Sequence, residues 1–179
     1  MAEPGGDASN GAGAAGAARA PLKNGDIAQV FDDIADLLEL REENAFRVIA
    51  YRNAARELRS TGYDIAALLA AGAPLPKMPG VGAELEAKIR EIFATGTSRT
   101  LEKLRKDYPP GLPALLRLPG IGPKRVRLFH DRLGVSSLEE LERAVRAGRL
   151  RSLGGFGPKS ERKILEAIQT VKSGDARRP

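Results

Sequence analysis

The sequence predicts an all-α fold. Three Gly-rich motifs support this prediction: MPGVG at residues 78–82, LPGIG at 118–122 and LGGFG at 153–157. Each follows a short apolar segment and opens a longer stretch whose apolar residues recur at helical spacing, and the motifs begin 40 and 35 residues apart. No stretch alternates with period two for long enough to predict a strand. We therefore interpret the motifs as the turns of three helix-hairpin-helix units.

Helical periodicity also marks the segments around these motifs. A first helix is predicted to begin at Asn24, which has the residue type of an N-cap, and further helices are predicted over 45–59 and 63–71. Between the second and third motifs, Ser136 and Glu139 fit a capping box that opens another helix. Every segment with a strong pattern is thus predicted to be helical.

The composition excludes several classes of protein. The 179 residues include no cysteine and one histidine, His130, so disulfides, thiolate metal sites and histidine-rich metal sites are excluded. No apolar run approaches the roughly 18 residues that a membrane span needs, and the first residues do not have the pattern of a signal peptide. We therefore expect a soluble intracellular protein that does not bind membranes.

Charge is distributed unevenly along the chain. Residues 1–76 hold 7 Lys and Arg against 11 Asp and Glu, a net charge of −4, whereas residues 77–179 hold 22 against 12, a net charge of +10. A basic segment of this kind favours a polyanionic partner such as nucleic acid, although a basic solvated surface has the same composition.

The second motif has the residues that a phosphate-binding turn needs. Pro119 ends the preceding helix, and Gly120 and Gly122 allow positive φ and the close approach of another backbone. Ile121 anchors the turn in the core, and Pro123 suits the first turn of the next helix. The expected result is a set of backbone N–H groups at a helix N-terminus, which favours an anion through hydrogen bonds and the helix dipole.

Cations follow two of the three motifs. Lys124 and Arg125 follow the second motif and Lys159 follows the third, whereas Glu84 follows the first and repels a close phosphate. We therefore expect the second hairpin to dominate DNA affinity and the first to bind most weakly; a plain packing turn is the alternative, above all for LGGFG. The turn residues assigned to the DNA backbone are Gly80, Val81, Gly82, Gly120, Ile121, Gly122, Gly155, Phe156 and Gly157.

The predicted groups contact the DNA backbone and not the bases. Backbone amides and Lys or Arg side chains bind phosphates, which position a protein on DNA without specifying sequence. No helix clusters Asn, Gln and Arg in a pattern suited to the major groove. Aromatic residues make up 4% of the chain, which disfavours base stacking on single strands.

Five segments, in this order, resemble a known family: NGDIAQVFDDIADLLEL, AFRVIAYRNAARELR, MPGVGAELEAKIREIFATG with LEKLRKD, LRLPGIGPKRVRLFHDRLGVSSLEEL, and LRSLGGFGPKSERKILEAI. They cover about five-sixths of the chain, residues 24–172, and resemble the N-terminal region of a bacterial PolX-type family X DNA polymerase, related to DNA polymerase beta. The resemblance implies a fold like the N-terminal domains of DNA polymerase beta, a function in base excision repair, and a cytoplasmic, nucleoid-associated location.

The resemblance also implies a domain organisation. It consists of a disordered Gly/Ala-rich tail over 1–22, a lyase-like helical domain with the first hairpin over 23–105, a fingers-like DNA-binding domain with the other two hairpins over 106–172, and a tail over 173–179. In that family the two domains grip DNA on both sides of a gap, so gapped or nicked duplex is the expected partner, with a separate polymerase or repair protein as a further one. The sequence contains neither a palm with its metal-binding carboxylates nor a histidine-rich phosphoesterase domain, so we expect neither polymerase nor nuclease activity from it.

The resemblance implies a cation site but no required cofactor. In the family, hairpin carbonyl oxygens hold a monovalent cation, Na⁺ or K⁺. The matching carbonyls here belong to Pro76, Met78 and Val81 in the first hairpin and to Leu116, Leu118 and Ile121 in the second.

The resemblance places one candidate catalytic residue at Lys88, the position of a lysine that forms a Schiff base with an abasic sugar. The residues that match the DNA-contacting pocket around it are Arg47, Tyr51 and Arg52. Glu84 and Thr100, however, stand where the family has lysines. Glu84 and Lys88 are also spaced for an i, i+4 ion pair, which favours the charged amine, whereas a nucleophile must be neutral. We therefore expect lyase activity to be feeble or absent.

Three functions are therefore kept open. The first is sequence-independent binding of the DNA backbone by part of a repair polymerase. The second is an abasic-site or 5′-deoxyribose-phosphate lyase that uses Lys88. The third is an interaction scaffold whose hairpins bind protein.

Overall fold

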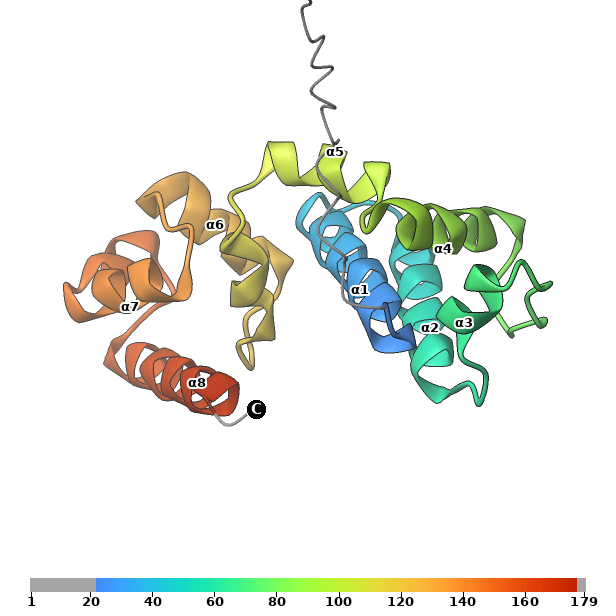
Figure 1. Ribbon diagram of the computed structural model, residues 1–179. Helices are drawn as coiled ribbons and strands as arrows, with labels where there is room; N and C mark the ends of the chain where they lie inside the picture. The colour runs from blue at the N-terminus through green and yellow to red at the C-terminus, as the bar shows by residue number, and fades with distance from the viewer. Residues whose placement is uncertain (1–21, 177–179) are drawn as a thin grey trace, which may run out of the picture.

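The computed structural model describes residues 22–176, and this range is all-α as predicted (Figure 1). The elements are α1 Asn24–Leu40, α2 Ala45–Ser60, α3 Ile65–Ala70, α4 Ala83–Thr95, α5 Arg99–Asp107, η1 Leu112–Arg117, α6 Pro123–Leu133, α7 Leu138–Arg146, η2 Arg149–Leu153 and α8 Pro158–Ala176, where η marks a 3₁₀ helix. The tail expected over 1–22 lies outside the described residues except at Leu22. The tail expected to begin at 173 does not begin there, because α8 continues to Ala176.

The first half of the molecule is built around α1 and α2, which pack along each other. Ile27, Phe31, Ile34 and Leu38 on α1 are completely buried, and their i, i+3/i+4 spacing explains why this segment forms an amphipathic helix. In Figure 1 these helices lie on the right, with α4 on their outer side and α5 across the top.

The second half contains η1 to α8 and shares its core with the first. Leu112 at the start of η1 and Phe129 on α6 are completely buried, and one continuous cluster of buried side chains extends from Ile27 to Ile168. Both η1 and α6 contact α1. An ion pair between Arg127 of α6 and Glu42 of the α1–α2 turn, at 3.1 Å, also joins the two halves.

Two local predictions need correction. Asn24 is not the N-cap of α1; it lies in the first turn, and its side chain donates to the carbonyl oxygen of Tyr63 at 2.7 Å and accepts from the N–H of Ile65 at 2.9 Å. Asn24 thereby holds the start of α3 against the start of α1, and α3 begins at Ile65 rather than at Tyr63.

The capping box that opens α7 is displaced by one residue from the predicted pair of Ser136 and Glu139. Ser137 is the N-cap and accepts from the N–H of Glu140 at 3.2 Å, while the Glu140 carboxylate accepts from the N–H of Ser136 at 2.6 Å. The burial of Leu138 and Leu141 sets this register, because their face of the helix must point to the core.

Among the described helices, none has the length and apolar content that crossing a bilayer requires.

Candidate nucleic-acid interface

The first two hairpins have the same backbone turn. Gly80 and Gly120 each have φ of +76°, and the apolar residue that follows donates its N–H to the carbonyl oxygen three residues earlier, at 3.0 Å for Val81 and 3.1 Å for Ile121. A Pro-Gly pair suits this geometry, because Pro has a suitable φ for the second position of a type II turn and Gly tolerates the positive φ of the third. Ile121 is 5% exposed and anchors the turn in the core, as predicted.

The last glycine of each hairpin is not required by the chain itself. Gly82 and Gly122 have φ of −86° and −93°, values that any residue adopts. No atom lies within 4 Å of the place where a Cβ would sit on Gly82, Gly122 or Gly157. The close approach expected at these glycines is therefore not made by another part of the described chain. At Gly122 the open space belongs to a pocket of about 770 Å³ that is also lined by three glutamates of the α1–α2 region, Glu39, Glu42 and Glu43.

The helices that follow these two hairpins begin without a side-chain cap. In contrast, α2, α3 and α7 are capped by Asn44, Asp64 and Ser137. Neither α4 nor α6 has a capping side chain, and the N–H groups of Gly122 and Lys124 donate to no acceptor in the part of the chain that the structure describes. These donors are available to an external anion.

The cations beside the second hairpin form no ion pair with the described residues. Lys124 and Arg125 are exposed, and within residues 22–174 neither has a carboxylate oxygen within 4.0 Å. Lys159 beside the third hairpin is likewise exposed and has no such partner among the described residues. Arg127, one turn further along α6, is instead paired with Glu42. The second hairpin thus combines open amides with two uncompensated cations.

The third hairpin differs from the first two in its turn. Gly154 has φ of +71°, which the Pro found at this place in the other hairpins cannot adopt, and Gly155 has φ of +75°. The hydrogen bond from Phe156 to Leu153, the equivalent of the turn bond in the other hairpins, is not formed in the described chain. Phe156 instead packs against Phe129 of α6, with ring centroids 5.5 Å apart.

Known proteins share these features of sequence and fold. Residues 22–98 match the family described as a helix-hairpin-helix domain, and residues 112–170 match a SAM-like helix-hairpin-helix tandem. The chain is 36% identical over 143 residues to DNA polymerase/3′-5′ exonuclease PolX of Bacillus subtilis (strain 168), an alignment that covers 80% of this chain and 24% of that relative. Most of the described chain therefore consists of helix-hairpin-helix domains, and its sequence is similar to that of this PolX protein. The chain spans about a quarter of the length of the relative it matches.

Lys88 does not form the ion pair with Glu84 that their spacing on α4 suggested. Its Nζ donates to Thr100 Oγ1 at 3.0 Å, and no carboxylate oxygen of the described residues lies within 4.0 Å of it. Lys88 is half-buried on α4, and Thr100 lies on α5. Thr100, which stands where the family has a lysine, therefore accepts a hydrogen bond from the candidate nucleophile Lys88 and carries no charge itself.

Tyr51, expected at the DNA interface, is a core residue. It is 2% exposed, and its ring meets that of Phe31 edge to face at 5.5 Å. Its hydroxyl is buried without a hydrogen-bond partner. Burial raises the pKa of Tyr51, and Arg47 opposes this shift while Glu84 adds to it. The side chain is thus part of the core and has almost no exposed surface with which to contact DNA.

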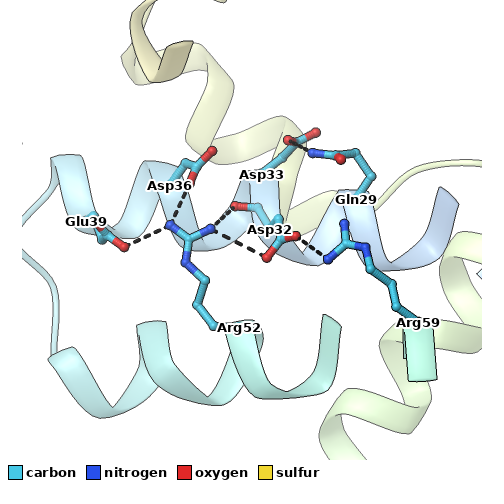
Figure 2. Close-up of polar contacts among 7 residues, drawn as sticks. All are labelled: Gln29, Asp32, Asp33, Asp36, Glu39, Arg52 and Arg59. Atoms are coloured by element: carbon cyan, nitrogen blue, oxygen red, sulfur yellow. Dashed lines mark hydrogen bonds and ion pairs between the residues drawn. The ribbon is translucent and has the colours of Figure 1, made fainter. Parts of the chain in front are cut away.

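Arg52 is also held within the protein. Its guanidinium lies 2.6 Å from Asp36, 2.8 Å from Glu39 and 3.5 Å from Asp32 on α1 (Figure 2). Burial lowers the pKa of Arg52, but hydrogen bonds to Glu39 and Asp36 outweigh it and leave the pKa above its ordinary value. Burial also raises the pKa of Asp36 despite the opposing effect of Arg52. Because three carboxylates compensate its charge, Arg52 is not placed to bind a DNA phosphate.

A basic pocket beside Lys88 was not predicted from the sequence. It has a volume of about 550 Å³, and the cations that line it are Arg41, Arg47, Lys103 and Lys106, with Thr100 between them and Lys88. Two carboxylates line the same pocket and compensate two of these cations: Glu43 pairs with Arg47 at 3.3 Å, and Asp107 pairs with Arg41 at 3.4 Å. Lys103 and Lys106 have no ion pair within the described range. The available signal was the spacing of the two lysines, i and i+3, which places them on one face of α5.

The carbonyl oxygens expected to hold a cation are partly engaged. Those of Met78 and Leu118 each accept the hydrogen bond that closes their turn, from Val81 and Ile121. A carbonyl oxygen has a second lone pair, so both remain able to coordinate an ion. No cluster of three or more His, Cys, Asp or Glu side chains suited to a metal ion occurs among residues 22–176.

Proposed function

We propose that this protein binds the DNA sugar–phosphate backbone without reading base sequence, and that the second hairpin supplies most of the affinity. The observation that carries the proposal is the open space in front of Gly122, where the chain itself does not require glycine. A phosphate oxygen approaching there meets unpaired N–H groups, the positive end of α6, and the charges of Lys124 and Arg125. The family matches and the relationship to PolX support DNA as the ligand.

The finer proposal is a preference for gapped or nicked duplex. It is supported by the separation of the hairpins, since the one that opens α4 belongs to the first half of the molecule and the one that opens α6 to the second (Figure 1). Labelled gapped, nicked and intact duplexes of one sequence, and scrambled versions of each, are titrated with protein at several salt concentrations. Each phosphate contact contributes about −0.9 to the slope of log K against log salt.

The outcomes of this titration separate the candidate functions. Steep salt dependence, insensitivity to sequence and tighter binding to gapped duplex support the proposal. Equal affinity for gapped and intact duplex overturns only the finer statement. A flat salt response, or binding that depends on sequence, overturns backbone recognition and favours a scaffold whose hairpins bind protein.

A second candidate function is a lyase that uses Lys88, supported by the absence of a carboxylate oxygen within 4.0 Å of its Nζ among the described residues. In the proposed step the neutral amine attacks C1′ of the open aldehyde form of a 5′-deoxyribose phosphate, and water leaves as the imine forms. A C2′ proton is then lost to solvent and the C3′–O bond breaks, which releases the 3′ phosphate as the 5′ end of the DNA. Hydrolysis of the imine by water frees Lys88 again. We expect weak activity, because Glu84 and Thr100 stand at positions that are lysines in the family. Borohydride trapping on a gapped substrate tests it: an adduct that disappears in Lys88→Ala supports the lyase, and the absence of any adduct rejects it.

We also propose that a monovalent cation, Na⁺ or K⁺, binds the hairpin carbonyls when DNA is bound. The free lone pairs on the Met78 and Leu118 carbonyl oxygens support this proposal. DNA affinity is measured in NaCl, KCl and tetramethylammonium chloride at one ionic strength. We expect DNA binding to be weaker in tetramethylammonium chloride than in NaCl or KCl. Equal binding in the three salts rejects the cation site.

A further inference from the structure

Arg125, beside the second hairpin, is held by two neutral groups. Its Nη1 donates to the carbonyl oxygen of Gly120 at 3.2 Å, within the hairpin turn itself. Its Cζ lies 5.4 Å from the ring centroid of Phe156, which belongs to the turn of the third hairpin. A guanidinium at this distance from an aromatic ring makes a cation–π contact. Two hairpins that lie 35 residues apart in sequence therefore meet at one arginine side chain.

Neutral partners fix the position of Arg125 without compensating its charge. Arg127, Arg52 and Arg151 are also fixed, but by carboxylates, in Arg151 by Glu161 at 3.1 Å. The carbonyl oxygen of Gly120 accepts from one N–H group of Arg125, and the Phe156 ring covers one face of the guanidinium. Arg has five N–H donors, so the others are free to bind a phosphate. An arginine ordered in this way loses less side-chain entropy on binding.

The turn of the third hairpin is built to present Phe156 to α6. Gly154 and Gly155 both have positive φ, at +71° and +75°, and the turn bond of the other hairpins is replaced by packing of Phe156 on Phe129. Phe129 is completely buried, which gives the Phe156 ring a rigid support. The turn residue of the third hairpin thus differs in kind from Val81 and Ile121, which only anchor their own turns.

We propose that Phe156 is a positioning residue for DNA binding: its ring holds the Arg125 guanidinium beside the open N-terminus of α6, so that the third hairpin supports the second. This proposal rests on the function proposed above. It explains why an aromatic residue stands where the other hairpins have an aliphatic one.

The test is a double-mutant cycle on DNA affinity with Phe156→Leu, Arg125→Ala and the combination. Phe156→Leu keeps apolar bulk and removes the ring, and we expect about threefold to tenfold weaker binding at fixed salt, the range for losing one pre-ordered side chain. In the Arg125→Ala background the same change is expected to have no further effect, because its target is gone. Phe156→Tyr keeps the ring and is therefore expected to bind DNA about as tightly as the unaltered protein. Lys124→Ala is the control background, in which Phe156→Leu retains its full effect.

A direct readout of the contact comes from Phe156→Trp. The sequence has no tryptophan, so the introduced indole is the only one, and its fluorescence is expected to change when a phosphate binds the Arg125 guanidinium that lies over it. In the Arg125→Ala background, the fluorescence of the introduced tryptophan is expected not to change when DNA is added. Thermal unfolding of each variant, without DNA, checks that the fold is intact.

The outcomes distinguish this proposal from the function on which it rests. If the unaltered protein does not bind DNA in a salt-dependent manner, the proposed function fails and the positioning function fails with it. If the unaltered protein binds but Phe156→Leu and Arg125→Ala are additive, or Phe156→Leu has no effect, only the positioning function is overturned. Coupled losses with rescue by Phe156→Tyr support it.

Discussion

The two glycines of the second hairpin allow folding and DNA binding to be perturbed separately. Gly122 has φ of −93° and open space around its missing Cβ, so Gly122→Val fits the backbone without a clash. The poorer N-cap costs up to about 1 kcal/mol, partly offset by the lower entropy of the unfolded chain. Gly120 has φ of +76°, so Gly120→Val adds backbone strain of about 1–3 kcal/mol. Only the second change is therefore expected to reduce stability substantially.

DNA binding is expected to respond in a different order. The valine side chain of Gly122→Val occupies the space in which a phosphate oxygen would approach the α6 amides. Loss of one charge-assisted hydrogen bond is worth about 1.5–3 kcal/mol, which corresponds to about 10-fold to 150-fold weaker binding at 25 °C. The slope of log K against log salt is expected to become less steep by about 0.9.

Urea unfolding and fluorescence-anisotropy titration at several salt concentrations measure the two effects. Gly62→Val is the matched control, because Gly62 is also open and free of positive φ but lies in the α2–α3 turn, away from the hairpins. It is expected to change neither quantity by much. The reasoning is refuted if Gly122→Val folds normally and binds DNA with unchanged affinity and salt slope.

Three further predictions concern charged side chains. Lys124→Glu is expected to weaken DNA binding more than Lys159→Glu in the same salt titration, and the reverse order would mean that the third hairpin dominates. Arg52→Ala leaves Asp36 and Glu39 without a cation, whereas Asp32 keeps its ion pair with Arg59, and the change is expected to lower the free energy of unfolding by about 1–3 kcal/mol in urea, with DNA affinity unchanged. Hydrogen bonds from Lys172 and Arg146 lower the pKa of Glu142, so its stabilising effect is present above about pH 4.3, the unfolded value, and is lost as pH falls through the lowered folded value. Glu142→Gln is therefore expected to unfold with a smaller difference in stability between pH 7 and pH 3; an unchanged difference would contradict this.

The all-α fold and the hairpin turns could be predicted from the sequence because they depend on local chemistry. Helical spacing of apolar residues selects the buried face of each helix, as in α1 from Ile27 to Leu38. The Pro-Gly pairs determine the turns at Gly80 and Gly120, because their φ preferences suit only a few conformations. The apolar side chain of Ile121, between two glycines, is buried and anchors its turn in the core, as its residue type predicts.

The partner of each polar side chain was decided by the tertiary structure. Lys88 has Glu84 at ion-pair spacing on its own helix, yet it contacts Thr100 on the next one. Arg52 is surrounded by carboxylates that α1 presents, and no pattern within α2 indicates this. Such contacts join residues far apart in sequence, so they depend on how helices pack and not on local preference.

The division between sequence and tertiary structure is clearest at the two hairpins of the second half. Residue types alone predict that Gly122 opens a helix and that Lys124 and Arg125 follow it. Only the packing of the third hairpin on α6 brings Phe156 to the Arg125 guanidinium, and only the folded chain leaves the space before Gly122 empty. Local sequence determines which groups can bind a phosphate, because turn and helix-start preferences act over a few residues. Tertiary packing determines which of those groups form ion pairs, which are held in place and which stay exposed to solvent. The neighbouring side chains that decide this come from distant parts of the chain.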